Sequence, residues 1–321
     1  MSQSPLDWTY RIRLRNLQVL LSLAKTQNLS HSALALHATQ PTLSKWLKEL
    51  ETDVGVPLFE RHSRGLKPTV YGEALISHAL RIDAHLSNAR DDLASMVRGG
   101  GGVVRIGSSG ASTANTVPNA VLHLMRSMPQ VRIKVSTGTM DDLMQQLDSG
   151  QLDIVVGGSA DMLPSGLRSE PLYEESLHFV VRPKHPLLKK RRISWNDLVA
   201  YPWLLWPQGT PIRNALDAAI SADGRKPPSQ VVESNSVTVN MALLNGSDLI
   251  GIASERAARR FAQLKVMASL PLTLPRAGSV VLWWREDAVE RPAVALALDA
   301  IRRASSGLEA TSLAEESDDL R

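Results

Sequence analysis

Apolar residues recur with the period of an α-helix through the first seventy positions of the chain, which predicts three short helices there. The first helix has one apolar face, made of Leu17, Leu20, Leu23 and Ala24. A second helix is expected over residues 30–37, with Ser30 as its cap. After a turn at 38–39, a third helix is expected over 40–53. Pro41 fits in its first turn, because the main-chain N–H groups there have no partner within the helix and the N–H that proline lacks is not needed.

The third of these helices has two chemically different sides. Its apolar stripe consists of Leu43, Leu47 and Leu50, which predicts that this side is buried. The residues expected to contact DNA are Gln40, Pro41, Thr42, Ser44, Lys45 and Lys48. Glutamine and serine can hydrogen-bond to base edges, and lysine can neutralise phosphates. Two helices joined by a tight turn, with a polar and basic free side on the second, predict a helix-turn-helix.

Two short strands are expected next, within residues 55–69, as a wing. Arg64 and Gly65 stand near its tip, where an arginine can lie in the minor groove of DNA. The DNA-binding domain is thus expected over residues 11–69. A three-helix core that binds another protein is the alternative, and the polar helix face together with the basic wing argues against it.

A long helix is expected over residues 70–98, because no proline and no glycine after Gly72 interrupts it. Its apolar positions step by four and three residues, which is a heptad pattern. These positions are Leu75, Ala79, Ile82, Leu86, Ala89, Leu93 and Met96. The pattern predicts a dimer held by this stripe, through Leu75, Ile82, Leu86 and Leu93. The alternative is a helix that packs on its own domain.

Four consecutive glycines at 99–102 mark an expected hinge, because glycine permits almost any backbone angle. Beyond them, extended and helical patterns alternate, at 103–106, 117–125, 131–135, 141–147 and 152–156. This alternation predicts an α/β domain over 103–304, with βαβ units and a parallel sheet. Residues 305–321 are expected to form an acidic, disordered tail.

Composition narrows the class of protein. With 321 residues and 43% hydrophobic content, the chain can bury the cores of two or three domains, which excludes global disorder. No apolar run is long enough for a transmembrane helix, and the N-terminus lacks the apolar segment of a secretory signal. The absence of cysteine excludes disulfide scaffolds, thiolate metal sites and a cysteine nucleophile, and it fits a cytoplasmic protein.

Charge and motifs point to binding rather than catalysis. Residues 11–70 contain nine basic and four acidic side chains, a local charge of +5 in a chain whose formal charge is +4, as expected for a polyanionic partner. Serine-hydrolase, zinc-protease, P-loop and dinucleotide-binding motifs are absent. His78 and His85 are seven residues apart, too far for a metal pair on adjacent helical turns. We therefore expect no enzyme, no cofactor and no metal.

Many residues of the N-terminal module stand at a specific mutual spacing, namely Ala33, Gln40, Pro41, Thr42, Leu43, Ser44, Leu50, Glu51, Gly55, Leu58, Phe59, Glu60, Arg61, Thr69, Gly72 and Glu73. Through these positions, residues 13–73 resemble the winged helix-turn-helix of LysR-type transcriptional regulators. The chain departs from the family pattern at Asn28, Leu29, Ser32 and Trp46, which bears on the operator sequence and on local packing.

Residues 103–304 resemble the effector domain of the same family, which is similar to a periplasmic binding protein with two α/β lobes. Lobe I is expected over about 103–176 and 281–304, and lobe II over about 177–280. The resemblance implies a homodimer or homotetramer that binds double-stranded operator DNA and a small effector, such as an acid, a sulfonate or a sugar. It also implies contact with RNA polymerase and no contact with membranes.

Ligands of such sheets lie at the carboxyl ends of the strands, near the N-termini of the following helices. The effector-binding residues expected in these loops are Ser109, Ser112, Thr137, Gly158, Trp206, Thr210 and Ser236. Ser109 and Ser112 match the family's usual contacts in the first lobe, and Thr210 lies in its usual loop of the second. For each hydroxyl the alternative is an ordinary N-cap, which is the preferred role for Thr113 and Thr139. Trp206 can stack on an effector or fill the region between the lobes.

The predicted function is effector-controlled transcription regulation on DNA. A solute-binding protein of transport is one alternative, and it would need the signal peptide that the sequence lacks. An enzyme of small-molecule metabolism on an α/β scaffold is the other, and it would need clustered titratable residues, which the sequence does not display.

Overall fold

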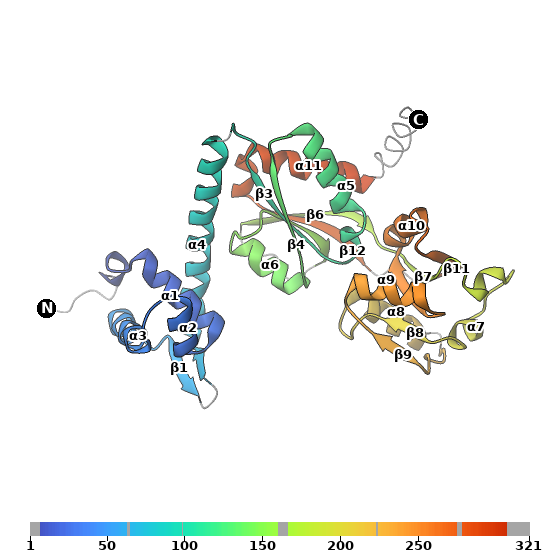
Figure 1. Ribbon diagram of the computed structural model, residues 1–321, viewed down its shortest axis with the longest axis horizontal. Coiled ribbons are helices and arrows are strands. Elements are labelled where there is room, and N and C mark those ends of the chain that lie inside the picture. The colour runs from blue at the N-terminus through green and yellow to red at the C-terminus, as the bar shows by residue number, and fades with distance from the viewer. Residues whose placement is uncertain are drawn as a thin grey trace. The chain divides into compact units, whose positions relative to one another are not determined.

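The computed structural model describes residues 7–62, 65–97, 99–159, 166–222, 224–274 and 278–306. The chain divides into two compact units, residues 1–97 with 148–151 and residues 98–147 with 152–321 (Figure 1). Two sequence predictions lie outside the described residues: Arg64 of the wing, and the acidic tail beyond Ser306. The tail was expected to begin at Ser305, and this start is wrong, because Ser305 and Ser306 form the end of a helix.

The N-terminal unit contains the predicted winged helix-turn-helix and the long helix that follows it. Its elements are a 3-10 turn (Asp7–Tyr10), α1 (Leu14–Thr26), α2 (Leu29–Ala35), α3 (Gln40–Val54), β1 (Phe59–His62), β2 (Gly65–Pro68) and α4 (Val70–Val97). β1 and β2 pair antiparallel as the wing, with Phe59 opposite Pro68. We call α3 the recognition helix, because it is the second helix of the helix-turn-helix.

Local capping fixes the ends of α2 and α3. Asn28 caps α2, because its side-chain oxygen accepts hydrogen bonds from two main-chain N–H groups of the first turn, at 2.8 and 3.1 Å. The prediction of Ser30 as the cap is wrong, since the helix starts one residue earlier and Ser30 lies inside its first turn. Thr39 caps the recognition helix, which ends at Gly55 with a φ of 82°, in the left-handed region that favours glycine.

The core of the N-terminal unit joins the helices to the wing. Its buried side chains include Leu20, Leu23, Leu43, Leu47, Leu50, Leu58 and Leu66. At the edge of this core, Gly72 lies so close to the wing that a Cβ atom there would be 2.0 Å from the carbonyl oxygen of Leu58. Only glycine fits at that distance, so the first turn of α4 is held directly against the wing.

The heptad positions of α4 fall into two groups. Leu75 packs against the core of the N-terminal unit, and Ala79 is fully buried in it, as expected for a helix that packs on its own domain. Farther along, Ile82, Leu86 and Leu93 are 42%, 46% and 64% exposed in the single chain. The apolar stripe that is accessible to a second helix therefore starts at Ile82.

Lobe I of the C-terminal unit is built on a five-stranded sheet of order β4-β3-β5-β12-β6 (Figure 1). Its elements are β3 (Val103–Ser108), α5 (Thr116–Ser127), β4 (Arg132–Thr137), α6 (Met140–Asp148), β5 (Ile154–Gly158), β6 (Leu167–Glu174), β12 (Ser279–Arg285) and α11 (Pro292–Ser306). β3 runs parallel to β4 and β5, whereas β12 runs antiparallel to β5 and β6. The sheet is thus mixed and not purely parallel as predicted, because β6 and β12 belong to the crossings between the lobes.

Lobe II is built on a second five-stranded sheet, of order β11-β7-β10-β8-β9. Its elements are β7 (Leu177–Val181), α7 (Trp195–Val199), β8 (Trp203–Leu205), α8 (Pro211–Ala222), β9 (Val231–Glu233), α9 (Val237–Gly246), β10 (Ile250–Ser254), α10 (Glu255–Gln263) and β11 (Ala268–Leu274). β8 runs parallel to β9 and β10. The chain passes from lobe I to lobe II between β6 and β7, and it returns between β11 and β12. The predicted α/β class is confirmed.

The glycine run at 99–102 has a steric role in addition to its conformational freedom. Gly99, Gly100 and Gly102 have φ values of 102°, 93° and 73°, in the region that favours glycine. Gly101 has an ordinary φ, but a Cβ atom there would lie 2.0 Å from the carbonyl oxygen of Gln130. That contact leaves no room for a side chain. A hinge at this run stays a prediction.

Candidate DNA interface and effector site

The recognition helix exposes the residue types that the sequence predicts at a DNA interface. Of the predicted residues, Ser44 is half-buried, whereas the fully exposed ones are Gln40, Pro41, Thr42, Lys45 and Lys48. The Ser30 hydroxyl lies 3.4 Å from the Gln40 side-chain oxygen, which links the starts of α2 and α3. The side-chain amide nitrogen of Gln40 has no such contact among the described residues, so it can donate to a base.

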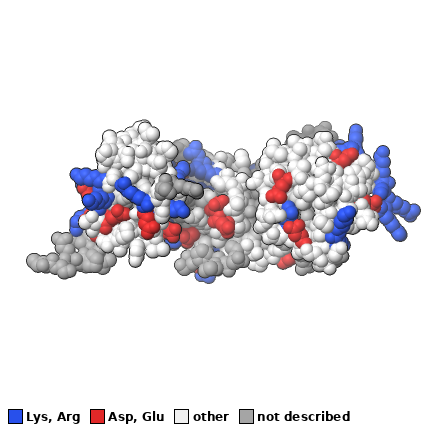
Figure 2. Space-filling model, turned by 90° about the horizontal axis from the view of Figure 1, so that it is seen from below, with Lys and Arg blue, Asp and Glu red and all other residues white. Residues whose placement is uncertain are grey.

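The two lysines of this helix differ in their electrostatic surroundings. The Lys45 ammonium lies 3.8 Å from Glu49 one turn later, an exposed pair that water weakens strongly. The Lys48 side chain has no carboxylate partner in the part of the chain that the structure describes. In the face drawn in Figure 2, acidic and basic side chains are interspersed along the molecule.

Two contacts hold the wing against the recognition helix. One carboxylate oxygen of Glu51 accepts hydrogen bonds from the main-chain N–H groups of Leu58 and Phe59, at 2.8 and 3.1 Å. The Arg61 guanidinium donates to the Ser44 hydroxyl at 3.3 Å. Arg61 is exposed and lies beside a predicted DNA contact, whereas the sequence indicates Arg61 only as part of the family motif. Its position in β1, one strand from the helix, depends on the hairpin pairing and was not predictable from spacing.

In lobe I, the predicted effector residues gather at one edge of the sheet. β3, β4 and β5 are parallel, and Ser108 pairs with Thr137 and with Val156. The strands therefore end together, and Ser109, Thr137 and Gly158 lie at the same carboxyl edge. This is the edge at which ligands of open α/β sheets bind.

The hydroxyls of this first loop are not equally available. Ser112 is fully buried, with its hydroxyl 2.7 Å from the carbonyl oxygen of Val156 and 2.9 Å from the Ser108 hydroxyl. The Thr113 hydroxyl also contacts Ser108, at 3.0 Å, so it braces the loop and does not cap a helix. Ser109 is half-buried, and its hydroxyl makes no side-chain hydrogen bond among the described residues. Ser109 is therefore the hydroxyl most available to a ligand.

In lobe II, the predicted residues also gather at the carboxyl edge of parallel strands, but most have local partners. Trp206 is half-buried, and its indole N–H donates to the carbonyl oxygen of Ile252 at 3.3 Å. The Thr210 hydroxyl donates to the Pro207 carbonyl at 2.7 Å. Ser236 caps α9, accepting from a main-chain N–H at 3.3 Å. In lobe I, Thr139 caps α6 in the same way, as the sequence predicts.

The buried carboxylate of lobe I lies away from this edge. Asp153 precedes β5, at the amino end of the strand, and accepts a main-chain N–H bond from Arg105 at 2.8 Å. It also pairs with Arg291, at the start of α11. Burial raises the pKa of Asp153, and the attraction of Arg291 opposes that rise. This group holds β3, β5 and α11 together and has a structural role.

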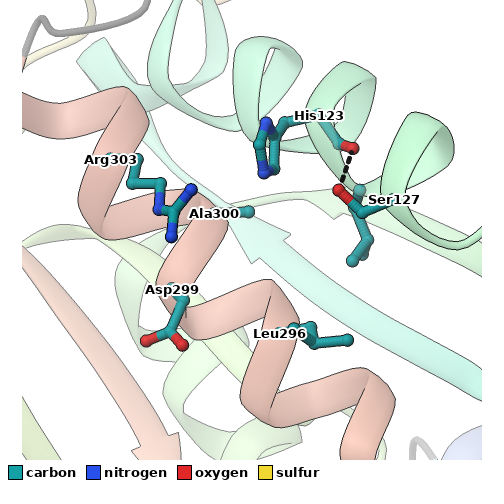
Figure 3. Close-up of a pocket in the computed structure, with 7 residues that line it drawn as sticks. His123, Ser127, Leu296, Asp299, Ala300 and Arg303 are labelled. Carbon is teal, nitrogen blue, oxygen red and sulfur yellow. Dashed lines mark hydrogen bonds between the residues drawn. The ribbon is translucent and has the colours of Figure 1, made fainter.

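A pocket of about 230 Å³ lies between α5 and α11 (Figure 3). Figure 3 shows His123 and Ser127 on α5, opposite Leu296, Asp299 and Arg303 on α11. None of the predicted site residues lines it.

Among the described residues, no cluster of histidine and acidic side chains could hold a metal ion. Every described helix is too short or too polar to cross a lipid bilayer.

Comparison with known proteins agrees with this architecture. Residues 14–73 match the family model for the bacterial regulatory helix-turn-helix protein of the lysR family. Residues 98–306 match the LysR substrate binding domain. The chain is 32% identical over 308 residues to the HTH-type transcriptional regulator GbpR of Azospirillum brasilense, covering 94% of this chain and 90% of the relative. It is 31% identical over 300 residues to the regulator PcaQ of Agrobacterium fabrum, covering 93% and 96%.

Solved structures show the same fold. The crystal structure of CbnR, a LysR family transcriptional regulator, matches with a TM-score of 0.65 at 20% identity, over 92% of this chain and 99% of CbnR. Full-length CbnR complexed with its target DNA matches with a TM-score of 0.64 at 19% identity, over 91% and 100%. The relatives are transcriptional regulators and not enzymes. With a lysR-type helix-turn-helix at one end and a LysR substrate binding domain over the rest, the chain belongs to the LysR family of DNA-binding transcriptional regulators.

Proposed function

We propose that this regulator binds its operator as a homodimer or homotetramer and changes transcription when a small polar molecule binds between lobes I and II. The observation that supports effector sensing is the half-buried Ser109 hydroxyl, without a partner in the described chain, at the shared carboxyl edge of three parallel strands. Acids, sulfonates and sugars all offer the acceptors that a hydroxyl and the adjacent main-chain N–H groups bind.

On DNA, the exposed side of the recognition helix would enter the major groove. The Gln40 amide would contact a base edge, while Lys45 and Lys48 would neutralise phosphates. Arg61 would join the interface through its contact with Ser44. Arg64 would reach the minor groove from the wing, as the sequence predicts.

Dimerisation would use the exposed half of the α4 stripe. Three exposed apolar side chains on one helix face, Ile82, Leu86 and Leu93, lose contact with water when a second α4 packs against them. Leu75 is partly buried against the core of its own unit, so the proposed contact relies on the residues from Ile82 onward. The same arrangement would present two recognition helices to the two halves of one operator.

The mechanism would be a ligand-dependent shift between two arrangements of the lobes. An effector shifts such an equilibrium only by the difference between its affinities for the two states. The changed angle between subunits would alter the bend or spacing of bound DNA, and thereby the access of RNA polymerase. Since the operator lies on chromosomal DNA, the cytoplasm is the proposed location.

Fluorescence anisotropy with DNA from upstream of the chain's own gene tests the DNA-binding half of the proposal. Gln40→Ala should cost about 1–3 kcal/mol on the operator and relax preference at one base pair. It should leave binding to random DNA of the same length unchanged. Equal losses on both DNAs would show that Gln40 does not contact a base.

A thermal-shift screen of acids, sulfonates and sugars on the full chain tests the sensing half. A ligand at 100 times its dissociation constant should add about 2.7 kcal/mol to the stability of the protein. Ser109→Leu should abolish the shift caused by any compound so found, whereas Thr139→Leu on the neighbouring helix cap should preserve it. An undiminished shift with Ser109→Leu would place the effector elsewhere.

A further inference from the structure

Arg256 stands at the point where the carboxyl edge of the lobe II sheet meets lobe I. β10 ends at Ser254, and α10 begins at the next residue, so Arg256 lies in the first turn of that helix. β10 runs parallel to β8, which ends just before Trp206. Arg256 thus shares the sheet edge at which the predicted effector loops of lobe II lie.

The hydrogen bond and the ring contact of the Arg256 guanidinium are both with lobe I. Its guanidinium lies over the ring of Tyr173 in β6, 3.6 Å from the ring centre. It also donates to the carbonyl oxygen of Ser305, in the last turn of α11, at 2.6 Å. A planar cation that stacks on an aromatic ring while it hydrogen-bonds to a carbonyl is held in one orientation. One side chain of lobe II is therefore fixed by two elements of lobe I.

A buried acid lies near this contact. Glu175 lies in the crossing between β6 and β7 and is 6% exposed, and one of its carboxylate oxygens has no hydrogen-bond partner among the residues that the structure describes. The charged and titratable groups around it are Arg256 and Glu255 from α10 and Tyr173 from β6. Burial is the largest influence and raises the pKa of Glu175 to about 7, while the attraction of Arg256 opposes the rise.

Tyr173 also links this contact to the helix that follows the first effector loop. The Tyr173 hydroxyl lies 2.9 Å from the hydroxyl of Thr116, which is fully buried at the start of α5. α5 follows the loop that contains Ser109. The start of α5, which follows the effector loop along the chain, is therefore linked through Tyr173 to the guanidinium of lobe II.

We propose that Arg256 is a positioning residue that fixes the angle between lobes I and II, with Tyr173 and Ser305 as its anchors and with the buried Glu175 nearby. The effector loops lie at the carboxyl edges of the two sheets, so this angle would set the distance between them. This inference deepens the proposed function, since it concerns the same site between the lobes. Its test needs no effector, so it can fail or succeed independently of Ser109.

The chain contains no cysteine, so two introduced cysteines can be labelled specifically. Gln145→Cys on α6 and Ser221→Cys on α8 place one spin label on an exposed position of each lobe. Double electron–electron resonance on the full chain should give a narrow distance distribution. Arg256→Met, which keeps an unbranched side chain about as far as Nε but removes the charge and the planar group, should broaden or shift that distribution.

Two further variants separate positioning from general destabilisation. Arg260→Met changes the same residue type in the same helix at an exposed position, and it should preserve the narrow distribution. Arg256→Lys keeps the charge and a donor for the Ser305 carbonyl, so it should restore part of the narrow distribution. If circular dichroism shows that Arg256→Met does not fold, the broadening is measured on Arg256→Lys alone. A wild-type distribution in the folded Arg256 variants would overturn the proposal.

The pH dependence of the distance distribution tests the role of Glu175. If Glu175 only filled space, the distribution would be the same at every pH in this range. A state in which Glu175 is open to water has a lower pKa for this carboxyl, so deprotonation favours that state. The distance distribution should therefore broaden as the pH rises from about 6 to about 8, and Glu175→Gln should remove the change. A distribution that shifts with pH equally in Glu175→Gln would overturn the role assigned to Glu175.

Discussion

The attachment of the wing to the recognition helix can be tested at Glu51. A single carboxylate oxygen accepts hydrogen bonds from two consecutive main-chain N–H groups, those of Leu58 and Phe59. These residues are 1% and 7% exposed, so water cannot readily replace the acceptor. Glu51→Ala leaves both donors unsatisfied, at about 1–2 kcal/mol each. We expect the local opening of the wing to become easier by about 2–4 kcal/mol.

Hydrogen–deuterium exchange of a peptide that covers residues 56–62 in the full chain measures this opening directly. A loss of about 2–4 kcal/mol corresponds to exchange that is about 30- to 1,000-fold faster. Glu51→Gln retains an acceptor oxygen and should accelerate exchange much less. Operator affinity should fall with Glu51→Ala, because the wing and Arg61 lose their fixed position beside Ser44.

Glu49→Ala provides the matched control on the same helix. Glu49 is exposed, and its contact with Lys45 spans 3.8 Å, so its removal should change exchange of the wing little. Similar exchange of the wing peptide in Glu51→Ala and Glu49→Ala would refute the reasoning, because the wing would then be held by other contacts.

Three further outcomes are expected. Lys48→Ala should weaken binding to all DNA sequences alike and reduce the salt dependence of binding measured by anisotropy; a changed base preference with an unchanged salt slope would contradict its assignment to a phosphate. The double substitution Ile82→Asp and Leu86→Asp should dissociate the assembly in sedimentation velocity, since it places unpaired carboxylates in the helix contact, and an unchanged mass would exclude that contact. Gly101→Ala should lower the melting temperature in calorimetry, because the added Cβ would lie 2.0 Å from the Gln130 carbonyl oxygen, and a wild-type melting temperature would show that the turn relaxes freely.

The N-terminal unit was largely predictable because its signals are local. The recognition helix was expected over 40–53 and extends over Gln40–Val54, since Pro41 and Gly55 define its ends within a few residues. The cap of α2 was not predicted correctly, because Asn28 and Ser30 are both good caps and the choice depends on where the helix starts. The split of the α4 stripe at Ile82 also escaped prediction, since a heptad pattern does not tell which partner covers each position.

The sequence predicts the loops of the candidate effector site, but it does not predict which side chains in them are available to a ligand. A hydroxyl-rich loop at the end of a strand predicts Ser109 and Ser112 equally as effector contacts. The sequence does not indicate that the Ser112 hydroxyl is buried against the carbonyl oxygen of Val156, 44 positions later. The contact of Arg256 with Tyr173 joins residues 83 positions apart, across two lobes. Such contacts depend on strand order and on the crossings between lobes, which local periodicity does not encode.

The close fit of Gly72 against Leu58 makes the wing, the recognition helix and α4 one stiff piece. α4 has 28 residues and is therefore about 42 Å long. A rod of this length amplifies motion: a tilt of about 10° at one end displaces the other by about 7 Å, or about two base-pair steps of DNA. In the proposed dimer, a slight change in the crossing of two such rods would move the recognition helices from one operator spacing to another, so no part of the DNA-binding unit itself needs to change shape.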